Sequence, residues 1–182
     1  MRHIQLFLFA LSVMSLGVFS ACSDDDTNGS GAMIDENEHT YNIEIAGGET
    51  FSGSVPKNTG GLYYPVSYIE YNEEVGSKIL TGLLQDAGKF QFGIGLALDN
   101  NNNPSIQGSG PGLTFGEWGV EDKYRPVGNI NMDLENYQEH SISLYGEEAT
   151  VASYTLSFSG KFKLGAEGDE VNVTGKIGVA AP

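Results

Sequence analysis

The side chains that could perform catalysis are few in this sequence. Beyond the N-terminal apolar run the histidines are His39 and His140, and no serine lies in a Gly-x-Ser-x-Gly turn that would present a nucleophile. His39 lies in or beside a polar segment. His140 stands between Glu139 and Ser141 at a strand entrance, where we expect it to be solvated. The sequence therefore predicts no catalytic residues and a protein that is not an enzyme.

Carboxylates are plentiful, but their spacing is that of solvated turns rather than of a paired acid and base. Asp99, Asn101 and Asn103 resemble the start of an oxygen-rich calcium loop, yet the central glycine is missing and Gly110 stands where the bidentate acid belongs. We interpret this segment as a polar turn and expect no metal site and no cofactor. Calcium binding there or at residues 24–26 is the alternative.

The only cysteine, Cys22, follows an apolar run that starts at Ile4, behind Arg2, and ends at Phe19. This run is shorter than the roughly 20 residues that a membrane-spanning helix needs, and its layout is that of a signal peptide. Phe19-Ser20-Ala21-Cys22 resembles the lipobox of bacterial lipoproteins, with phenylalanine where leucine is commoner. The resemblance implies removal of residues 1–21 and covalent lipid, palmitate included, on the Cys22 thiol. An ordinary signal peptide with an incidental cysteine is the alternative.

Four polar residues follow the cysteine directly: Ser23, Asp24, Asp25 and Asp26. They resemble the surface-export signal of lipoproteins from Bacteroidota-type bacteria. This resemblance implies a lipid-anchored protein of the outer membrane that faces the cell exterior. If the acidic residues are only a solvated tether, the protein faces the periplasm. The resemblance covers residues 1–26 and carries no information about the domain downstream.

Composition divides the rest of the chain into a tether and one domain. Residues 22–38 are mostly Asn, Gly, Ser, Asp and Glu, which cannot bury enough apolar surface to offset the entropy of ordering. Residues 39–182 have the length of one domain with its own hydrophobic core. We therefore expect a signal peptide, a lipidated flexible tether and a single folded domain.

Charge narrows the range of partners. The chain has 9 Lys and Arg against 24 Asp and Glu, and loss of Arg2 with the signal peptide leaves a net charge of −16. No basic cluster is visible along the sequence, which argues against nucleic acid and against electrostatic binding to anionic lipid. Membrane attachment is therefore expected through the lipid anchor, and the acidity is expected to keep the protein soluble.

The elements that must position any site are strands, because apolar residues alternate with polar ones through most of the domain. Regular series run from Tyr154 to Leu164 and from Val171 to Val179, joined by a Gly-rich turn as a C-terminal hairpin, and from Phe90 to Leu98. Shorter series lie at 41–45, 51–55, 130–134 and 142–144. For 75–87, where apolar spacing is helical, we prefer a strand from Lys78 to Leu84 because Gly76 and Gly82 disfavour a helix. The fold class expected is all-β, a single antiparallel β-sandwich or flattened β-barrel of about 8–10 strands.

Aromatic residues in the less regular middle of the chain are the candidate binding residues. Trp118, Tyr124, Tyr63 and Tyr64 lie away from the regular strand series, and Trp118 belongs to a Gly-rich segment from Pro104 to Pro126 that we interpret as a long loop. Aromatic faces stack on sugars and peptides, although Trp118 as a plug over one end of the core is the alternative. Two functions follow: a noncatalytic β domain that binds an extracellular glycan or protein, or a structural accessory protein of the envelope with no small ligand.

Overall fold

The computed structural model describes residues 37–57, 66–106 and 112–182, and within these ranges every regular element is a β-strand. The strands are β1 (Glu38–Ile45), β2 (Thr50–Pro56), β3 (Ser67–Asn72), β4 (Ser77–Asp86), β5 (Phe90–Leu98), β6 (Pro104–Ile106), β7 (Gly112–Glu117), β8 (Tyr124–Pro126), β9 (Asn131–Leu144), β10 (Glu147–Leu164) and β11 (Glu170–Val179). All pairings between them are antiparallel. The expected all-β antiparallel class is confirmed.

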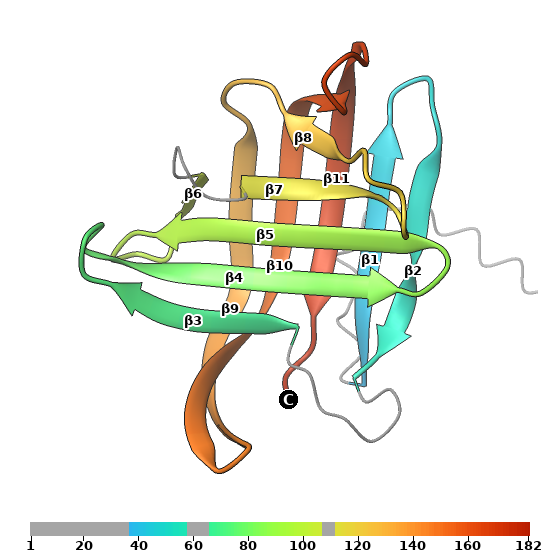
Figure 1. Cartoon of the computed structure of the whole chain (residues 1–182). Helices are drawn as coiled ribbons and strands as arrows, with labels where there is room; N and C mark the ends of the chain where they lie inside the picture. Colours follow the sequence, from blue (N-terminus) through green and yellow to red (C-terminus); the bar gives the residue numbers. More distant parts are fainter. Residues whose placement is uncertain (1–36, 58–65, 107–111) are drawn as a thin grey trace, which may run out of the picture. The chain divides into compact units, whose positions relative to one another are not determined.

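Hydrogen bonding joins the strands in the order β2-β1-β11-β10-β8-β7-β5-β4-β3, with β6 added to β5 and β9 added to β10. This order does not return to its start, so the sheet is open and the flattened barrel, one of our two alternatives, is wrong. The sheet has 11 strands, slightly more than the expected 8–10, because β6 and β8 contribute three residues each. In Figure 1, β3, β4, β5 and β7 run across β1, β9, β10 and β11, so that one sheet folds over itself like a sandwich with crossed layers.

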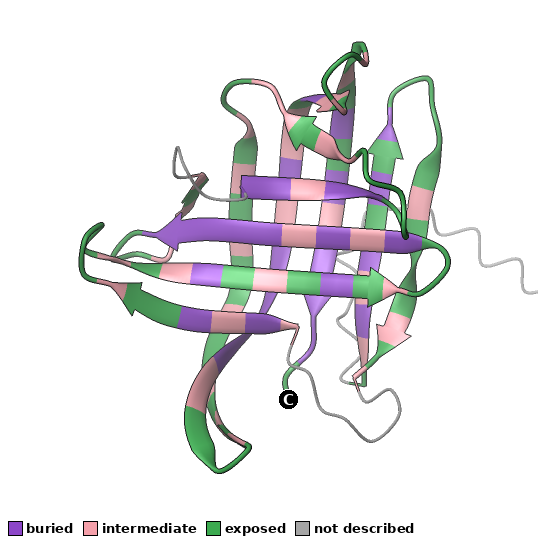
Figure 2. Cartoon of the chain, in the orientation of Figure 1, coloured by how far each residue is buried: buried purple, intermediate pink, exposed green. Residues whose placement is uncertain are grey.

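The core lies between the two crossed layers. Alternate residues of β5 and β10 are buried there, among them Phe90, Phe92, Leu96, Leu156 and Phe162, each at most 2 % exposed. Figure 2 shows these buried positions along the middle of both layers. The three long apolar series that predicted strands are thereby confirmed as core strands.

Most local predictions hold. The preferred strand over Lys78–Leu84 is part of β4, which turns at residues 86–89 into β5. The C-terminal hairpin is β10 and β11, paired from Tyr154↔Val179 to Lys163↔Glu170. The short series at 130–134 and 142–144 belong to one strand, β9, whose register shifts near Asn136, a residue with φ of 54°.

One sequence-based interpretation is wrong. The long loop expected from Pro104 to Pro126 instead contains β6, β7 and β8, and Leu113 and Phe115 of β7 are fully buried. Its glycines concealed the alternation of a strand that pairs with β5. His39, expected in or beside the tether, lies in β1 and is 6 % exposed.

Glycines on β11 and β2 leave room for two large aromatic rings of the strands next to them. A Cβ on Gly175 of β11 would lie 2.1 Å from Cζ of Phe158, its cross-strand partner in β10. A Cβ on Gly53 of β2 would lie 2.6 Å from the hydroxyl oxygen of Tyr41, its partner in β1. Glycine at position 175 thus permits the close approach of the Phe158 ring.

Candidate functional site

Strands β1, β11, β10 and β9 belong to one of the two crossed layers, and this layer has an outer face that points away from the core. Its residues alternate with buried ones: Asn42 and Glu44 flank buried Ile43 in β1, and Thr174 and Lys176 lie on either side of Gly175 in β11. In β10 and β9 the same face is formed by Ser157, Ser159, Asn131 and Asp133. We refer to these residues on β1, β11, β10 and β9 as the outer face.

Strand register sets the outer-face residues in two parallel rows. Asn42, Lys176, Ser157 and Asp133 are successive cross-strand partners. The adjacent row consists of Glu44, Thr174, Ser159 and Asn131. Neighbouring strands lie about 4.8 Å apart, so each row spans about 14 Å. Eight polar side chains thus form a regular grid across four strands.

This grid lines a shallow hollow of about 380 Å³, open to solvent. The hollow is lined by Asn42, Glu44, Asn131, Met132, Asp133, Ser157, Phe158, Ser159, Thr174, Gly175 and Lys176. Its size is within the range of small-ligand sites. The side chains supply amides, hydroxyls, two carboxylates and one ammonium, which can donate and accept hydrogen bonds in many directions.

Four of the nine basic residues of the chain gather on the same side of this layer. Lys161 and Lys163 follow Ser157 and Ser159 at alternate positions of β10, and Arg125 of β8 is the cross-strand partner of Lys163. Lys176 completes the set from within the hollow. We call Arg125, Lys163, Lys161 and Lys176 the cationic strip, and Glu170 of β11 lies opposite Lys163 within it.

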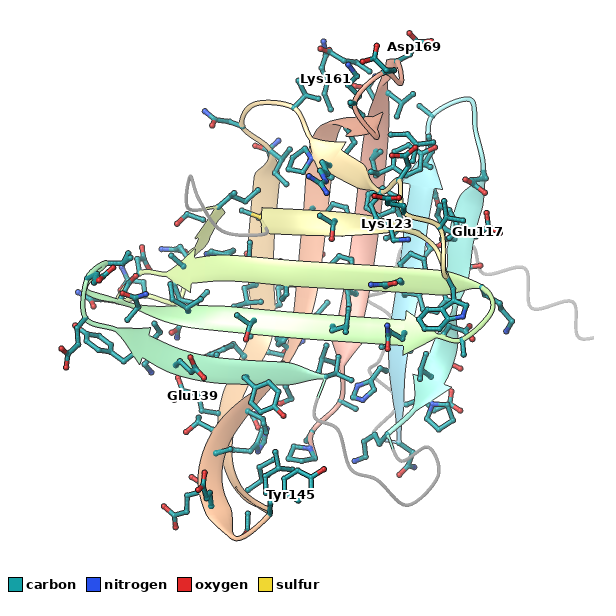
Figure 3. The ribbon with its side chains drawn as sticks, in the orientation of Figure 1. Glu117, Lys123, Glu139, Tyr145, Lys161 and Asp169 are labelled. Carbon is teal, nitrogen blue, oxygen red and sulfur yellow. The ribbon has the colours of Figure 1, made fainter. Side chains whose placement is uncertain are left out.

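Only one member of the cationic strip has a carboxylate partner. Lys161 Nζ lies 3.1 Å from Glu170 Oε2. The ion pairs of the described residues include none to Arg125, Lys163 or Lys176. Figure 3 shows Lys161 and Asp169 at the end of the layer where β10 turns into β11.

The aromatic residues expected to bind a ligand do not form one platform in the described part of the chain. The ring of Tyr124 stacks on that of Phe115, with centroids 5.0 Å apart and planes at 15°, so one of its faces is used in packing. Trp118 is 39 % exposed, which argues against a core plug, and its backbone N–H donates to the carbonyl of Lys89. Tyr63, Tyr64, Cys22, Ser23, Asp24, Asp25 and Asp26 lie outside the described residues.

The two histidines have structural contacts. His140, which we expected to be solvated, is half-buried, and its Nε2 lies 2.8 Å from Ser153 Oγ. No carboxylate of the described residues contacts this imidazole, so the pair lacks the group that orients the base in a catalytic triad. His39 Nδ1 accepts a hydrogen bond of 3.1 Å from the Ala180 N–H, and burial, with the nearby charge of Lys57, lowers the pKa of His39 to about 4.

The segment that resembles a calcium loop is a closed polar turn. The Asp99 carboxylate accepts hydrogen bonds from both the side-chain amide and the backbone N–H of Asn103, and from the backbone N–H of Asn101, each at 2.8 Å. These bonds, with that of the Asn103 side chain largest, lower the pKa of Asp99. Within the ranges the structure describes, no three His, Cys, Asp or Glu side chains are grouped to hold a metal ion.

Comparison with protein-family models, with curated proteins and with solved structures finds no match for this chain. In the described ranges no helix is long and apolar enough to span a membrane.

The sequence held a signal for the outer face that our reasoning passed over. Lys161 and Lys163 flank core residue Phe162, which places both on the solvent side of β10. In the hairpin of β10 and β11, Lys176 is the cross-strand partner of Ser157 and therefore lies on the same side of the sheet. Arg125 gave no such signal, because β8 lies in the segment that we interpreted as a loop.

Proposed function

We propose that this protein is a noncatalytic, lipid-anchored surface module that binds an extracellular glycan on the outer face of β1, β11, β10 and β9. The observation that carries the proposal is the polar grid around the 380 Å³ hollow. The Cys22 motif and the acidic residues behind it support attachment to the outer membrane with the domain outside the cell.

The chemistry of the grid favours a polyhydroxylated ligand. Asn42 and Asn131 each offer an amide donor and acceptor, and Ser157, Ser159 and Thr174 offer hydroxyls that can act in either role. A sugar presents several hydroxyls within a few ångströms of one another, and each can both donate and accept. A flat grid of mixed donors and acceptors matches that pattern, and it needs no apolar anchor.

A structural accessory protein remains the second candidate, and a specific observation favours it. Strand β9 is 14 residues long and pairs with β10 on one side only, which leaves an edge that a neighbouring protein strand can extend. Acidic side chains and the shift near Asn136 interrupt this edge, as expected of an edge protected against pairing. We therefore place the glycan surface first.

The test is retention of the soluble domain, residues 33–182, in native gels containing individual polysaccharides, both neutral and acidic. Asn42→Ala combined with Asn131→Ala removes two exposed amides from opposite sides of the hollow, and we expect it to weaken binding about tenfold or more. Thr81→Ala, at an exposed position of β4 in the other layer, is the matched control and should bind as wild type.

Two results would reject the outer face as the site. Retention that persists in the double variant would place binding elsewhere, and loss of retention in Trp118→Ala would move it to the β7–β8 connection. Absence of retention with every polysaccharide would favour the structural alternative.

A further inference from the structure

The cationic strip is unexpected in so acidic a chain. The chain has 24 Asp and Glu against 9 Lys and Arg, and Lys78, Lys89 and Lys161 form ion pairs. Arg125 and Lys163 instead face each other as cross-strand partners. Like charges in directly opposed positions destabilise a sheet. Glu170, the cross-strand partner of Lys163 on β11, offsets this repulsion from one side only, and the ion pairs of the described residues include none to Arg125 on the other side.

The cationic strip runs along strand β10. Side chains on one face of a strand recur about every 6.7 Å, so the Lys163 position lies about 20 Å along β10 from Ser157, the cross-strand partner of Lys176. Lys161 lies between these ends. Hydroxyls of Ser159 and Thr174 fill the interval between Lys161 and Lys176. Along the outer side of β10 and β11, Lys176 is therefore followed by neutral hydroxyls and then by Lys161 and Lys163, whose partners on β11 are Asn172 and Glu170.

Carboxylates on this side of the layer lie at both flanks of the hollow and, as Glu170, on β11 opposite Lys163. Glu44 belongs to β1 and Asp133 to β9, the strands that flank β11 and β10. Glu170 is engaged by Lys161. At physiological salt charges are screened over about 8 Å, so the negative charge of the rest of the domain weakens at the strip, whereas a bound anion would contact the cations directly.

We propose that the glycan bound on the outer face is an acidic polysaccharide, whose carboxylate or sulfate groups are bound by Lys176 within the hollow and by Lys163 and Arg125 at the far end of the strip. This inference rests on the proposed function and specifies its ligand. Arg125 can bind a carboxylate through two parallel hydrogen bonds, and Lys176 and Lys163 act as point charges. The alternating hydroxyls and amides bind the neutral part of each sugar.

Charge alone would also suit a nucleic acid or an anionic membrane. The residues of the outer grid include no exposed aromatic ring on which bases could stack, which is the usual means of binding single strands. The hydroxyl and amide groups between the cations are suited to sugar hydroxyls rather than to closely spaced phosphates. The observations therefore favour an acidic glycan.

The experiment compares polygalacturonate with its methyl ester, two polymers of one backbone that differ only in charge. Binding to the domain of residues 33–182 is measured by titration calorimetry at 50 and 300 mM NaCl. We expect polygalacturonate to bind at low salt, to weaken with salt, and to bind at least tenfold more tightly than the ester. Lys176→Gln and Lys163→Gln should each lower polygalacturonate affinity about tenfold, a larger factor than either substitution lowers affinity for the ester.

Lys89→Gln removes the same charge from the β4–β5 turn of the other layer and is the matched control, with less than twofold effect expected. Lys163→Arg should retain binding. Each variant is checked for a wild-type melting temperature, so that loss of binding is not loss of folding.

The outcomes separate this inference from the function on which it rests. Equal binding of polygalacturonate and its ester would overturn the acidic ligand and leave the glycan function intact. Preference for polygalacturonate that survives Lys176→Gln and Lys163→Gln would overturn the cationic strip as its site. Binding of neither polymer, nor of sulfated dextran, would overturn the acidic ligand, and the neutral polysaccharides of the native gels then decide the glycan function separately. Binding only to phosphatidylglycerol vesicles would overturn the glycan in favour of a membrane surface.

Discussion

At the scale of single residues, two buried polar side chains complete the hydrogen bonding where β11 ends. Strand β10 extends beyond its last pairing with β11, at Tyr154↔Val179, so Ala152 has no β11 partner. Ser67 of β3 takes that place: its hydroxyl donates to the Ala152 carbonyl at 2.6 Å and accepts from the Ala152 N–H at 3.1 Å. On the adjacent strand, His39 accepts from the Ala180 N–H. These contacts seal one end of the core.

Ser67→Ala should destabilise the domain by about 1–3 kcal/mol, because it leaves the buried N–H and carbonyl of Ala152 without partners. Urea unfolding followed by fluorescence measures the loss. Ser54→Ala, at an exposed position of β2, is the matched control and should change stability by less than about 0.5 kcal/mol. Equal effects of the two substitutions would contradict the sealing role of Ser67.

His39 should make stability depend on pH. Its folded pKa of about 4 lies below the ordinary value of 6.5, since burial and Lys57 disfavour the charged ring. The unfolded chain therefore binds a proton first, and stability present above pH 6.5 is lost as pH falls toward 4, by about 3 kcal/mol at most. In His39→Gln, which cannot titrate, the stability loss between pH 6.5 and 4.5 should be smaller. Parallel stability curves for the two proteins would exclude His39 as the cause.

At the level of the strands, the outer face carries only polar side chains because the large aromatic rings lie on the opposite side of the sheet. Phe158 lies over Gly175, and Tyr41 lies over Gly53. Tyr41 also stacks on Phe90 of the other layer, with centroids 4.2 Å apart, and donates to Asp86 Oδ2 at 2.6 Å. An ion pair also joins the two layers: Nζ of Lys78 in β4 lies 2.5 Å from Oε1 of Glu139 in β9, which is labelled in Figure 3.

Gly175→Ala should destabilise the domain by about 1–3 kcal/mol, because the new methyl group overlaps the Phe158 ring. In a Phe158→Leu background, where the ring is absent, the same substitution should cost less. A double-mutant cycle of urea unfolding measures the difference. If Gly175→Ala costs the same in both backgrounds, the ring contact is not what requires glycine at this position.

The alternation of apolar residues was sufficient to predict the strands with regular cores, including β5, β10 and β11. It failed for β7, where glycines at both ends and a short length left too few alternating residues to recognise. The open sheet and the place of Arg125 in the cationic strip could not be predicted, because both depend on which strands become neighbours. Arg125 and Lys163 are distant in sequence and meet only through the pairing of β8 with β10.

At the scale of the whole molecule, the proposed lipid anchor and export signal should place the binding domain outside the cell. We expect protease treatment of intact cells to remove the wild-type protein. Replacement of Asp24, Asp25 and Asp26 by Ala should leave the protein membrane-bound but protected, and Cys22→Ala should release it from the membrane fraction. Protection of the wild type as well would reject surface display and favour a periplasm-facing lipoprotein.

The central claim is that the outer face of β1, β11, β10 and β9 is the ligand surface. The most direct measurement is a map of backbone amide chemical shifts in the domain of residues 33–182, titrated with oligogalacturonate. Our account predicts that the shifts concentrate at Asn42, Thr174, Lys176 and Ser157, and at Lys163 toward the end of β10. Shifts centred on Trp118 and the β7–β8 connection, with the outer face unchanged, would contradict it.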